Sequence, residues 1–329
     1  MTSRSQELER FKREIDLRQF AAAHGYGVDQ KASSASGTVM RGADGSKIRI
    51  TRGTDGHYVY WNAHDESDSG SVIDFLQNRK GANLGQVRQQ LRPWIGAVGT
   101  KPPTPASLLT EQLPELVPVA RDLARVQSQI DGMAELQGGA HPYLNSERGI
   151  PAELLMDVRF SGSVRVDARR NAVFIHTNQD GPCGFELKNR AFTGFSKGGV
   201  KGLWVSACRK DDQRLVFAES GLDCLSYAVL HGHAETRFMS ISGQPSDQQM
   251  DLAALAIQKM PPGELVLAFD NDEAGDQLTA RFTDLFSDCP RSDCTLRVDR
   301  PVSRGFDWNR ELQETLKRTV SPPPPEGCP

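Results

Sequence analysis

One short apolar stretch constrains the fold of this chain more than any other. Residues 265–269 (LVLAF) are continuously apolar and short enough to form a strand that is buried on both faces. Asp270 and Asp272 follow the run directly, one residue apart. In open α/β sheets, ligands bind at the carboxyl ends of the strands. The apolar residues after Gly275 recur at helical spacing, which predicts a helix that packs back on the sheet.

This stretch belongs to a regular alternation of strands and helices. We predict strands at 215–218, 238–241, 265–269 and 295–298, and helices at 221–231, 247–260, after 275 and at 308–317. Such an alternation predicts an α/β domain, here residues 211–318, with a parallel sheet and helices on both faces. Glu219 ends one strand as Asp270 ends another, and right-handed crossovers bring such strand ends to one edge of the sheet.

Several carboxylates at one edge favour a divalent metal site. Ionised carboxylates repel each other unless a cation lies between them, and hard cations prefer oxygen ligands. We therefore expect Mg²⁺ or Mn²⁺ to be bound there, with the catalytic acids Glu219, Asp270 and Asp272 as ligands and Asp223, one helical turn after Glu219, in support. The alternative is an Asp-rich turn whose acids only cap the following helix.

Charge is distributed unevenly along the 329 residues. Lys and Arg outnumber Asp and Glu by 11 to 6 in residues 141–210 and are outnumbered by 7 to 16 in residues 211–300. A basic segment followed by an acidic one suits a protein that grips polyanions with one part and metal with another. The alternative is a pair of ordinary solvated faces.

Cysteine usage and hydropathy indicate the cellular setting. The six cysteines are scattered without a CxxC pair, so we expect reduced thiols in a cytoplasmic protein. No run is long enough to cross a bilayer and the N-terminus is not a signal peptide, so we expect no membrane association.

Residues 1–95 predict a small α+β domain. Helical spacing at 5–24 precedes two strands at 47–51 and 57–61, joined by a turn at Asp55-Gly56, and Ser71 caps a later helix. A further helix at 84–91 closes the domain. Residues 96–114, rich in Pro, Gly, Ser and Thr, predict an interdomain linker, and the proline-rich tail 319–329 predicts disorder.

Residues 115–210 predict a basic domain of mixed α+β structure. A helix is expected at 116–137, two short helices around Gly149 and Pro151, and short strands from 158 to 205. Residues 185–204 (FELKNRAFTGFSKGGVKGLW) combine glycines with cations, and glycines let the backbone approach a phosphate closely. The alternative is a sheet edge that lysines protect from aggregation.

Two motifs of the acidic segment carry a family resemblance. FAESGLDCLS (217–226) and FDNDEAG (269–275) resemble the Toprim domain that is shared by bacterial primases, type IA and type II topoisomerases and some nucleases. RPVSRGFDWNREL (300–312) resembles the closing segment of that family. The resemblance implies that Asp307 assists the metal site and that Arg304 contacts phosphate.

The front of the chain resembles the zinc-ribbon domain of bacterial replicative primases. The resemblance rests on IDLRQFAAAHGY, DGHYVYWN and GSVIDFLQ, in this order. No cysteine precedes Cys183, and His24, His57 and His64 alone do not make a structural zinc site, so no zinc is expected.

An aromatic core is expected to take the place of the zinc. We expect Tyr58, Tyr60 and Trp61 to form it. Alternatively, an exposed ring stacks on single-stranded bases while Arg49 and Arg52 hold phosphates.

The middle of the chain resembles the primase catalytic core. YLNSERGI (143–150) resembles the segment that opens this core, and the basic run resembles the part whose cations face nucleoside triphosphate and template. The resemblance implies six contacts to nucleotide or nucleic acid, from Arg148, Lys188, Arg190, Lys197, Lys201 and Arg304.

The preferred interpretation is a DNA primase-like nucleotidyltransferase that makes primers from nucleoside triphosphates on single-stranded DNA. One alternative is a Toprim nuclease, in which the same acids direct water at a phosphodiester. Another is a non-catalytic DNA-binding accessory of plasmid or mobile-element replication or transfer. A mobile-element setting, with a helicase or a relaxase as a possible partner, fits a primase core without a recognisable helicase-binding tail.

Overall fold

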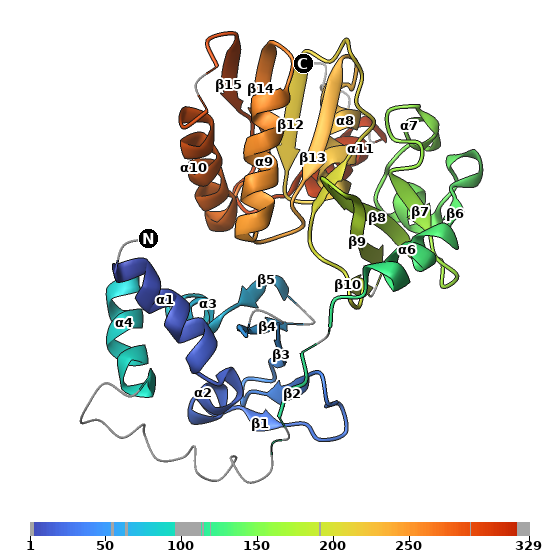
Figure 1. The fold of residues 1–329 in the computed structure, drawn as a ribbon. Coiled ribbons are helices and arrows are strands. Elements are labelled where there is room, and N and C mark those ends of the chain that lie inside the picture. Colours follow the sequence, from blue (N-terminus) through green and yellow to red (C-terminus); the bar gives the residue numbers. More distant parts are fainter. Residues whose placement is uncertain are drawn as a thin grey trace, which may run out of the picture. The chain divides into compact units, whose positions relative to one another are not determined.

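The computed structural model describes most of the chain and divides it into two compact units. The described residues are 3–53, 56–62, 65–95, 113, 115–118, 120–190, 192–289 and 291–320. The first unit comprises residues 1–121 and the second residues 122–329 (Figure 1). The predicted linker 96–114 therefore lies almost wholly outside the described residues, as do Asp55 in the predicted turn, His64, and the tail from 321 onward.

In its described residues, the first unit combines a five-stranded antiparallel sheet with four α-helices. The strands pair in chain order and are β1 (Gly27–Val28), β2 (Thr38–Arg41), β3 (Lys47–Arg52), β4 (Tyr58–Asn62) and β5 (Asp65–Gly70). The helices are α1 (Ser3–Glu14), α2 (Leu17–Ala23), α3 (Val72–Lys80) and α4 (Leu84–Leu91), and a short 3₁₀ turn, η1 (Arg92–Ile95), follows. This is the small α+β fold that the sequence predicts.

Strand alternation decides which aromatic residues of the first unit are buried. Ile48, Ile50, Tyr58 and Tyr60 join a core with Phe20 and Phe75. Trp61 follows Tyr60, so its side chain points to the opposite face of the sheet, and 42% of it is exposed. The prediction that Trp61 belongs to the aromatic core is therefore wrong, whereas Tyr58 and Tyr60 do belong to it.

The end of the first unit also differs from the predicted domain boundary. Leu116 is buried in the core of the first unit, so the chain remains part of that unit beyond residue 114. The predicted helix at 116–137 is correspondingly shorter, since α6 spans Leu123–Asp131. Pro118 disfavours an earlier start, and the side chain of Asp122 caps the helix by accepting a hydrogen bond from the Arg125 amide at 3.0 Å.

The second unit begins with short elements and an antiparallel region. After α6 come β6 (Ala134–Glu135), η2 (Gln137–Gly139), a π-helical turn η3 (Tyr143–Glu147) and α7 (Ala152–Met156). The strands that follow are β7 (Val164–Val166), β8 (Ala172–Asn178), β9 (Gly181–Asn189), β10 (Phe192–Phe195) and β11 (Leu203–Val205).

Strands and helices then alternate as predicted. They are β12 (Arg214–Ala218), α8 (Gly221–His231), β13 (Thr236–Ser240), α9 (Asp247–Lys259), β14 (Gly263–Leu267), α10 (Glu273–Ser287), β15 (Cys294–Val298) and α11 (Trp308–Val320). Residues 319 and 320 of the predicted tail thus continue the last helix.

One continuous sheet runs through the second unit. Its order is β10-β9-β8-β11-β13-β12-β14-β15, with β7 beside β8 and β6 beside β7. Strands β13, β12, β14 and β15 are parallel, while β11 is antiparallel to both β8 and β13. The basic and acidic segments, predicted as separate domains, therefore contribute to the same sheet.

Helices cover both faces of the parallel part, which confirms the predicted α/β architecture (Figure 1). Val216, Ala218, Val266 and Ala268 pack on the side of α8 and α11. The alternate residues Leu215, Phe217, Leu265 and Leu267 pack on the side of α9 and α10. This two-sided burial explains the continuous apolar runs of β12 and β14.

Two other expectations concern thiols and membrane segments. Cys183, Cys208, Cys224, Cys289 and Cys294 are free, as expected. None of the helices in the described part of the chain combines the length and the apolar character that crossing a bilayer requires.

The predicted cap of α3 allows a direct test of the first unit. The Ser71 hydroxyl accepts a hydrogen bond from the Ile73 amide at 3.2 Å, and Asp74 in turn accepts one from the Ser71 amide at 2.6 Å. We expect Ser71→Ala to lower the free energy of unfolding by about 1 kcal/mol in urea denaturation, because the first turn loses its cap. Gln90→Ala, at an exposed position of α4, serves as the control and should change it by less than about 0.5 kcal/mol.

Candidate metal and nucleotide site

Acidic side chains gather at the carboxyl ends of the adjacent parallel strands β12 and β14. Glu219 directly follows β12, and Asp270 lies three residues after the end of β14. The predicted strand 265–269 thus begins and ends two residues later than β14 (Gly263–Leu267). Ala268 nevertheless continues the pairing through its amide, which donates to the Phe217 carbonyl at 2.8 Å. The two carboxylates therefore lie on neighbouring chain segments at one edge of the sheet, as predicted.

The backbone at Asp270 is fixed from two sides. A Cβ atom at Gly275 would lie 2.0 Å from the Asp270 carbonyl oxygen, so only glycine allows the first turn of α10 to pack this closely. The Arg300 guanidinium donates to the same carbonyl oxygen at 3.0 Å. The position of the Asp270 side chain consequently depends on both α10 and the segment after β15.

Two of the predicted metal ligands also cap helices. The Asp272 carboxylate accepts a hydrogen bond from the Gly275 amide at 2.8 Å, and the Asp307 carboxylate accepts one from the Arg310 amide at 2.6 Å. Each cap uses one carboxylate oxygen, so a metal-binding part for these two residues stays a prediction. Asp223, in the first turn of α8, accepts a hydrogen bond from the Ser220 hydroxyl at 2.6 Å.

Glu219 and Asp270 are different, because each has a buried oxygen without a hydrogen-bond partner. Among the described residues, Oε1 of Glu219 and Oδ1 of Asp270 are buried and accept no hydrogen bond. An unpartnered buried carboxylate oxygen is costly unless a cation or an additional donor satisfies it. These two atoms are thus the natural contact points for a positively charged ligand.

The electrostatics of the cluster are dominated by burial and like charge. Burial raises the pKa of Glu219, and the nearby charges of Asp223 and Asp272 raise it further. Burial likewise raises the pKa of Asp270, with contributions from Asp223, Glu219 and other acids of the cluster. The predicted carboxylates are therefore close enough to sense one another, and bringing a cation among them would relieve the repulsion.

A divalent cation with few protein ligands fits this arrangement. In the part of the chain that the structure describes, no group of three or more His, Cys, Asp and Glu side chains is arranged to hold a metal ion. Asp223, Asp272 and Asp307 each use a carboxylate oxygen within the protein, and their part as metal ligands stays a prediction. Mg²⁺ commonly uses one or two carboxylates together with waters and substrate phosphates, and Glu219 and Asp270 supply two such oxygens.

Three of the predicted phosphate-binding cations are engaged within the second unit. Lys188 is 8% exposed and pairs with Glu186 at 3.5 Å. Lys201 donates to the Ser242 carbonyl at 2.8 Å, and burial lowers the pKa of its ammonium group. The Arg148 guanidinium lies 5.0 Å from the centre of the Tyr143 ring. These three side chains therefore interact with groups of the protein itself.

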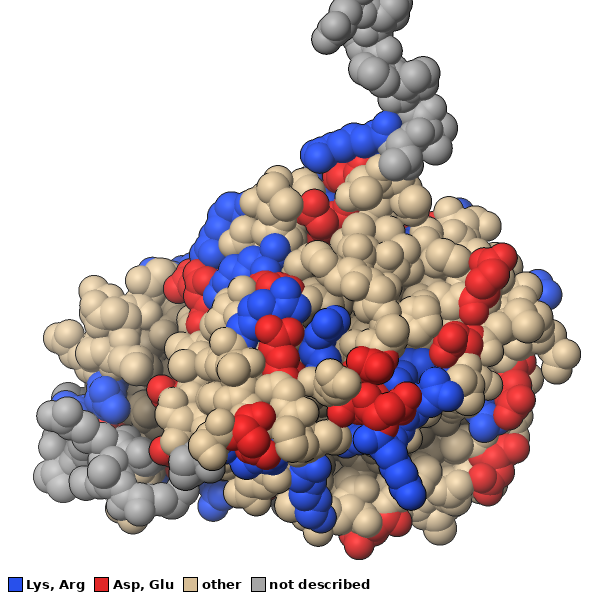
Figure 2. All heavy atoms as spheres, turned by 90° about the horizontal axis from the view of Figure 1, so that it is seen from above, with Lys and Arg blue, Asp and Glu red and all other residues tan. Residues whose placement is uncertain are grey.

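The other three predicted cations are exposed. Arg190 pairs with Glu147 at 3.0 Å, and Arg304 pairs with Asp276 at 2.8 Å and donates to the Asn271 side chain at 3.2 Å. Lys197 is exposed and has no hydrogen bond or ion pair with a described residue. On the face of the molecule shown in Figure 2, cations and anions are interspersed, which agrees with solvated charge rather than with one large basic area there.

A buried polar network near the site was not predicted from the sequence. His176 Nε2 lies 3.0 Å from the Ser242 hydroxyl, which donates to Glu186 at 3.0 Å. Ser242 follows β13 and has a positive φ of 55°, which is uncommon for a residue other than glycine. Its position after a parallel strand is the one signal by which the strand-end rule could have found it.

No zinc site is predicted in the first unit, and two of its three histidines contact other groups of the protein. His24 Nδ1 donates to the Phe20 carbonyl at 2.8 Å, and His57 lies 3.0 Å from Glu9. His64 is outside the described residues.

The two segments of the second unit match two different family models. Residues 216–312 match the family model described as Toprim-like, so this part of the chain is a Toprim-like domain. Residues 142–212 match a model described as a protein of unknown function. The two matches meet near the predicted boundary at residue 210, although the sheet continues across it.

A curated relative is an uncharacterized, plasmid-borne protein of Bacillus anthracis. It is 23% identical over 201 residues, which are 54% of this chain and 58% of the relative. The chain thus spans little more than half the length of this relative.

Similar solved structures include three primase domains. A DNA primase domain from Pseudomonas aeruginosa is 13% identical over 50% of this chain and 57% of that one, with a TM-score of 0.33. The DnaG catalytic core is 14% identical over 54% of this chain and 70% of that one, with a TM-score of 0.36. The RNA polymerase domain of the Mycobacterium tuberculosis primase DnaG is 14% identical over 59% and 81%, with a TM-score of 0.32.

The raised pKa of Asp270 predicts how stability depends on pH without metal. The folded protein retains a proton that unfolded Asp270 releases above about pH 4, so the free energy of unfolding falls as the pH rises above that value. Asp270→Asn removes this contribution. In EDTA we expect the variant to have a higher Tm than the wild type at pH 8, and a smaller advantage at pH 5. Each kcal/mol of difference in the free energy of unfolding should correspond to about 2–4 °C in Tm.

Two further measurements make this prediction specific. Asp284→Asn changes an exposed acid of α10 and should leave Tm nearly unchanged at both pH values. Mg²⁺ or Mn²⁺ should raise the Tm of the wild type and not that of Asp270→Asn. An equal response of both proteins to the metal would show that Asp270 is not a ligand.

Proposed function

We propose that the second unit catalyses metal-dependent phosphoryl transfer on nucleic acid, and specifically primer synthesis on single-stranded DNA. The observation that carries the proposal is the pair of unpartnered oxygens of Glu219 and Asp270 at the carboxyl edge of a Toprim-like domain. In open α/β sheets this edge is the common position for ligands.

Glu219 and Asp270 are the residues that would hold Mg²⁺ or Mn²⁺. When bound, such a cation neutralises charge on phosphate oxygens and favours the ionised form of an attacking hydroxyl. Asp272 and Asp307 start α10 and α11 at the same edge, and Asp223 adds negative charge from α8. We assign these three residues a supporting part, in which they keep the edge anionic and the helix ends in place.

The cations contribute in two ways under this proposal. Lys197, Arg190 and Arg304 are exposed and would contact phosphates of nucleoside triphosphate or template, since surface ion pairs such as Arg190–Glu147 are weak and exchange readily. Arg148, Lys188 and Lys201 are engaged within the protein and would orient the segments around the phosphates.

A Toprim-type nuclease is the second candidate, and one observation favours it. Glu219 has a raised pKa and an unpartnered oxygen, which suits proton exchange with a water molecule. A non-catalytic accessory role is the third candidate, favoured by the absence of a three-residue metal cluster among the described residues. The plasmid-borne relative supports a mobile-element setting, in which a helicase or relaxase would be the protein partner.

Primer synthesis can be measured directly. We expect the intact chain, supplied with Mg²⁺ or Mn²⁺ and labelled nucleoside triphosphates, to extend short products on single-stranded DNA. Asp270→Asn should lower the rate by a factor of 100 or more, because one of the two anionic metal ligands becomes a neutral amide. Asp284→Asn should act like the wild type. Degradation of the template without synthesis would favour the nuclease, and neither reaction would favour the accessory.

Charge reversal at Lys197 separates the two enzymatic candidates. Lys197 is exposed, so Lys197→Glu is expected to fold normally. It should raise the KM for nucleoside triphosphate about tenfold in primer synthesis, because a phosphate contact becomes a repulsion. A nuclease needs no such contact and would be little affected. Reversal at Lys201 is a poorer test, since its ammonium group is bound to the Ser242 carbonyl inside the fold.

A further inference from the structure

A pocket in the first unit lies outside every element of the proposed active site. It has a volume of about 320 Å³ and is lined by residues from three segments. His24, Gly25 and Tyr26 come from the turn after α2, Gly42, Ala43 and Asp44 from the turn after β2, and Phe75, Arg79 and Lys80 from α3. This volume is near the lower end of the range for small-molecule sites, roughly 300–1,000 Å³.

Aromatic rings form much of the pocket lining. The rings of Tyr26 and Phe75 are 5.7 Å apart and those of His24 and Phe75 are 6.0 Å apart, both in edge-to-face geometry. The His24 ring also packs on Phe20 at 4.4 Å, which holds its orientation. Phe75 is fully buried and Tyr26 is 9% exposed, so the half-buried His24 ring is the aromatic surface on which a flat group could stack.

Arg79 is fixed within the lining and its charge is already balanced. It forms an ion pair with Asp68 and donates to the Tyr26 hydroxyl, and it also donates to Ser46 at 3.1 Å. The guanidinium therefore stabilises the position of Tyr26 and does not require an anion from outside.

Three polar groups around the pocket keep unused hydrogen-bonding capacity. Lys80 is exposed and has no hydrogen bond or ion pair with a described residue. His24 uses Nδ1 for the Phe20 carbonyl, which leaves Nε2 as an acceptor in the neutral ring. Hydrogen bonds from the Ser46 hydroxyl and amide to Asp44 Oδ1 lower the pKa of this carboxyl group, and Asp44 is exposed, so its carboxylate can accept further hydrogen bonds.

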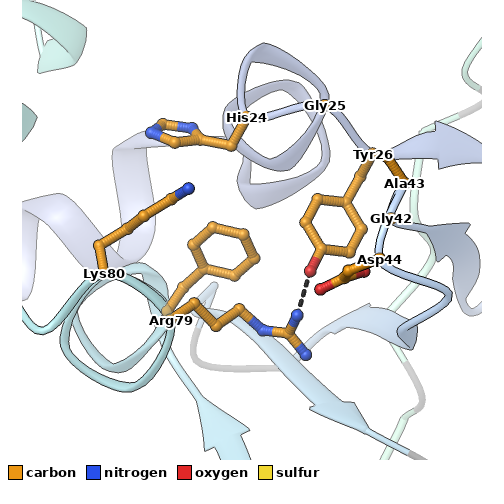
Figure 3. A pocket seen from close by; sticks show the side chains of 9 residues that line it. His24, Gly25, Tyr26, Gly42, Ala43, Asp44, Arg79 and Lys80 are labelled. Atoms are coloured by element: carbon orange, nitrogen blue, oxygen red, sulfur yellow. Dashed lines mark hydrogen bonds between the residues drawn. The ribbon is translucent and has the colours of Figure 1, made fainter.

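The opposite charges lie on different sides of the pocket. Figure 3 shows that the Lys80 side chain extends toward His24, whereas the carboxylate of Asp44 lies beside Tyr26. A ligand that uses both must carry an anionic group at one end, hydrogen-bond donors at the other, and a flat body between them. A nucleotide has this distribution, with a phosphate, a base and the amino or imino donors of the base edge.

We propose that this pocket binds a single nucleotide, with the base against the His24 ring, the phosphate at Lys80 and the base edge at Asp44. The nucleotide comes either from a free mononucleotide or from an unpaired position in a single strand. The site is independent of the proposed catalytic edge, because it belongs to the first unit and uses no residue of the second.

The test uses the intact chain in EDTA, which removes metal-dependent nucleotide binding at the catalytic edge. The probes are the four deoxynucleoside monophosphates and a single-stranded oligonucleotide, titrated by calorimetry. We expect Lys80→Ala to weaken binding about tenfold, since a charge-assisted phosphate contact is lost. Asp44→Ala should weaken binding of adenine, cytosine and guanine, which carry an amino donor, more than that of thymine, which has only the imino donor. Lys31→Ala, an exposed lysine outside the pocket, should bind like the wild type.

A second measurement locates the ligand. An oligonucleotide with one photoreactive 5-iodouracil should cross-link to the peptide that contains His24 and Tyr26, or to that of Phe75. Comparable affinity for monophosphate and oligonucleotide would identify a free-nucleotide site, and much tighter oligonucleotide binding that Lys80→Ala weakens would identify a strand.

Three outcomes would overturn the proposal: equal binding by Lys80→Ala and Lys31→Ala, cross-links confined to other peptides, or unchanged affinity for an abasic oligonucleotide. Asp270→Asn should abolish primer synthesis and leave this binding intact. Failure of one proposal is thereby distinguishable from failure of the other.

Discussion

Electrostatic repulsion between the half-buried carboxylates of Glu219 and Asp270 is the constraint to which the second unit is adapted. Both have a buried oxygen that no described hydrogen-bond donor satisfies, and Asp223 adds a third negative charge from α8. A fold tolerates such a cluster when the surrounding packing holds it in place. Here the apolar strands β12 and β14, buried on both faces, supply that packing, and the acids lie at the carboxyl ends of these strands.

The turn after β14 shows how closely the site and the fold depend on each other. Gly275 lets the first turn of α10 approach the Asp270 carbonyl, and Arg300 binds the same atom from the segment after β15. The Trp308 indole donates to the neighbouring Ala268 carbonyl at 2.8 Å, which ties α11 to the same turn. Positions on three elements therefore determine where a single carboxylate points, and such support is what a precisely placed ligand requires.

Local patterns predicted most of this architecture, and long-range geometry accounts for what they missed. The strands and helices of the second unit follow from apolar periodicity, and the acids at the strand ends follow from topology. An aspartate at the start of a helix suits both a cap and a metal ligand, so the role of Asp272 depended on the backbone entering α10. The internal bond of Lys201 depends on β11 pairing between β8 and β13, and the exposure of Trp61 on strand register. These pairings join residues that are far apart in the sequence, so no local sequence pattern predicts them.

The short strand β11 couples the unfolding of the two parts of the second unit. Residues Leu203–Val205 pair with β8 on one side and with β13 on the other, and so join the antiparallel region to the parallel one. With shared backbone hydrogen bonds and Trp204 fully buried between the two regions, neither region can open without exposing part of the other. Both should therefore melt in one cooperative transition, with amide hydrogen exchange slowest along this seam. The acidic edge and the basic strands would accordingly keep a constant spacing through thermal fluctuation, and adjustment to a substrate would fall to side chains and loops.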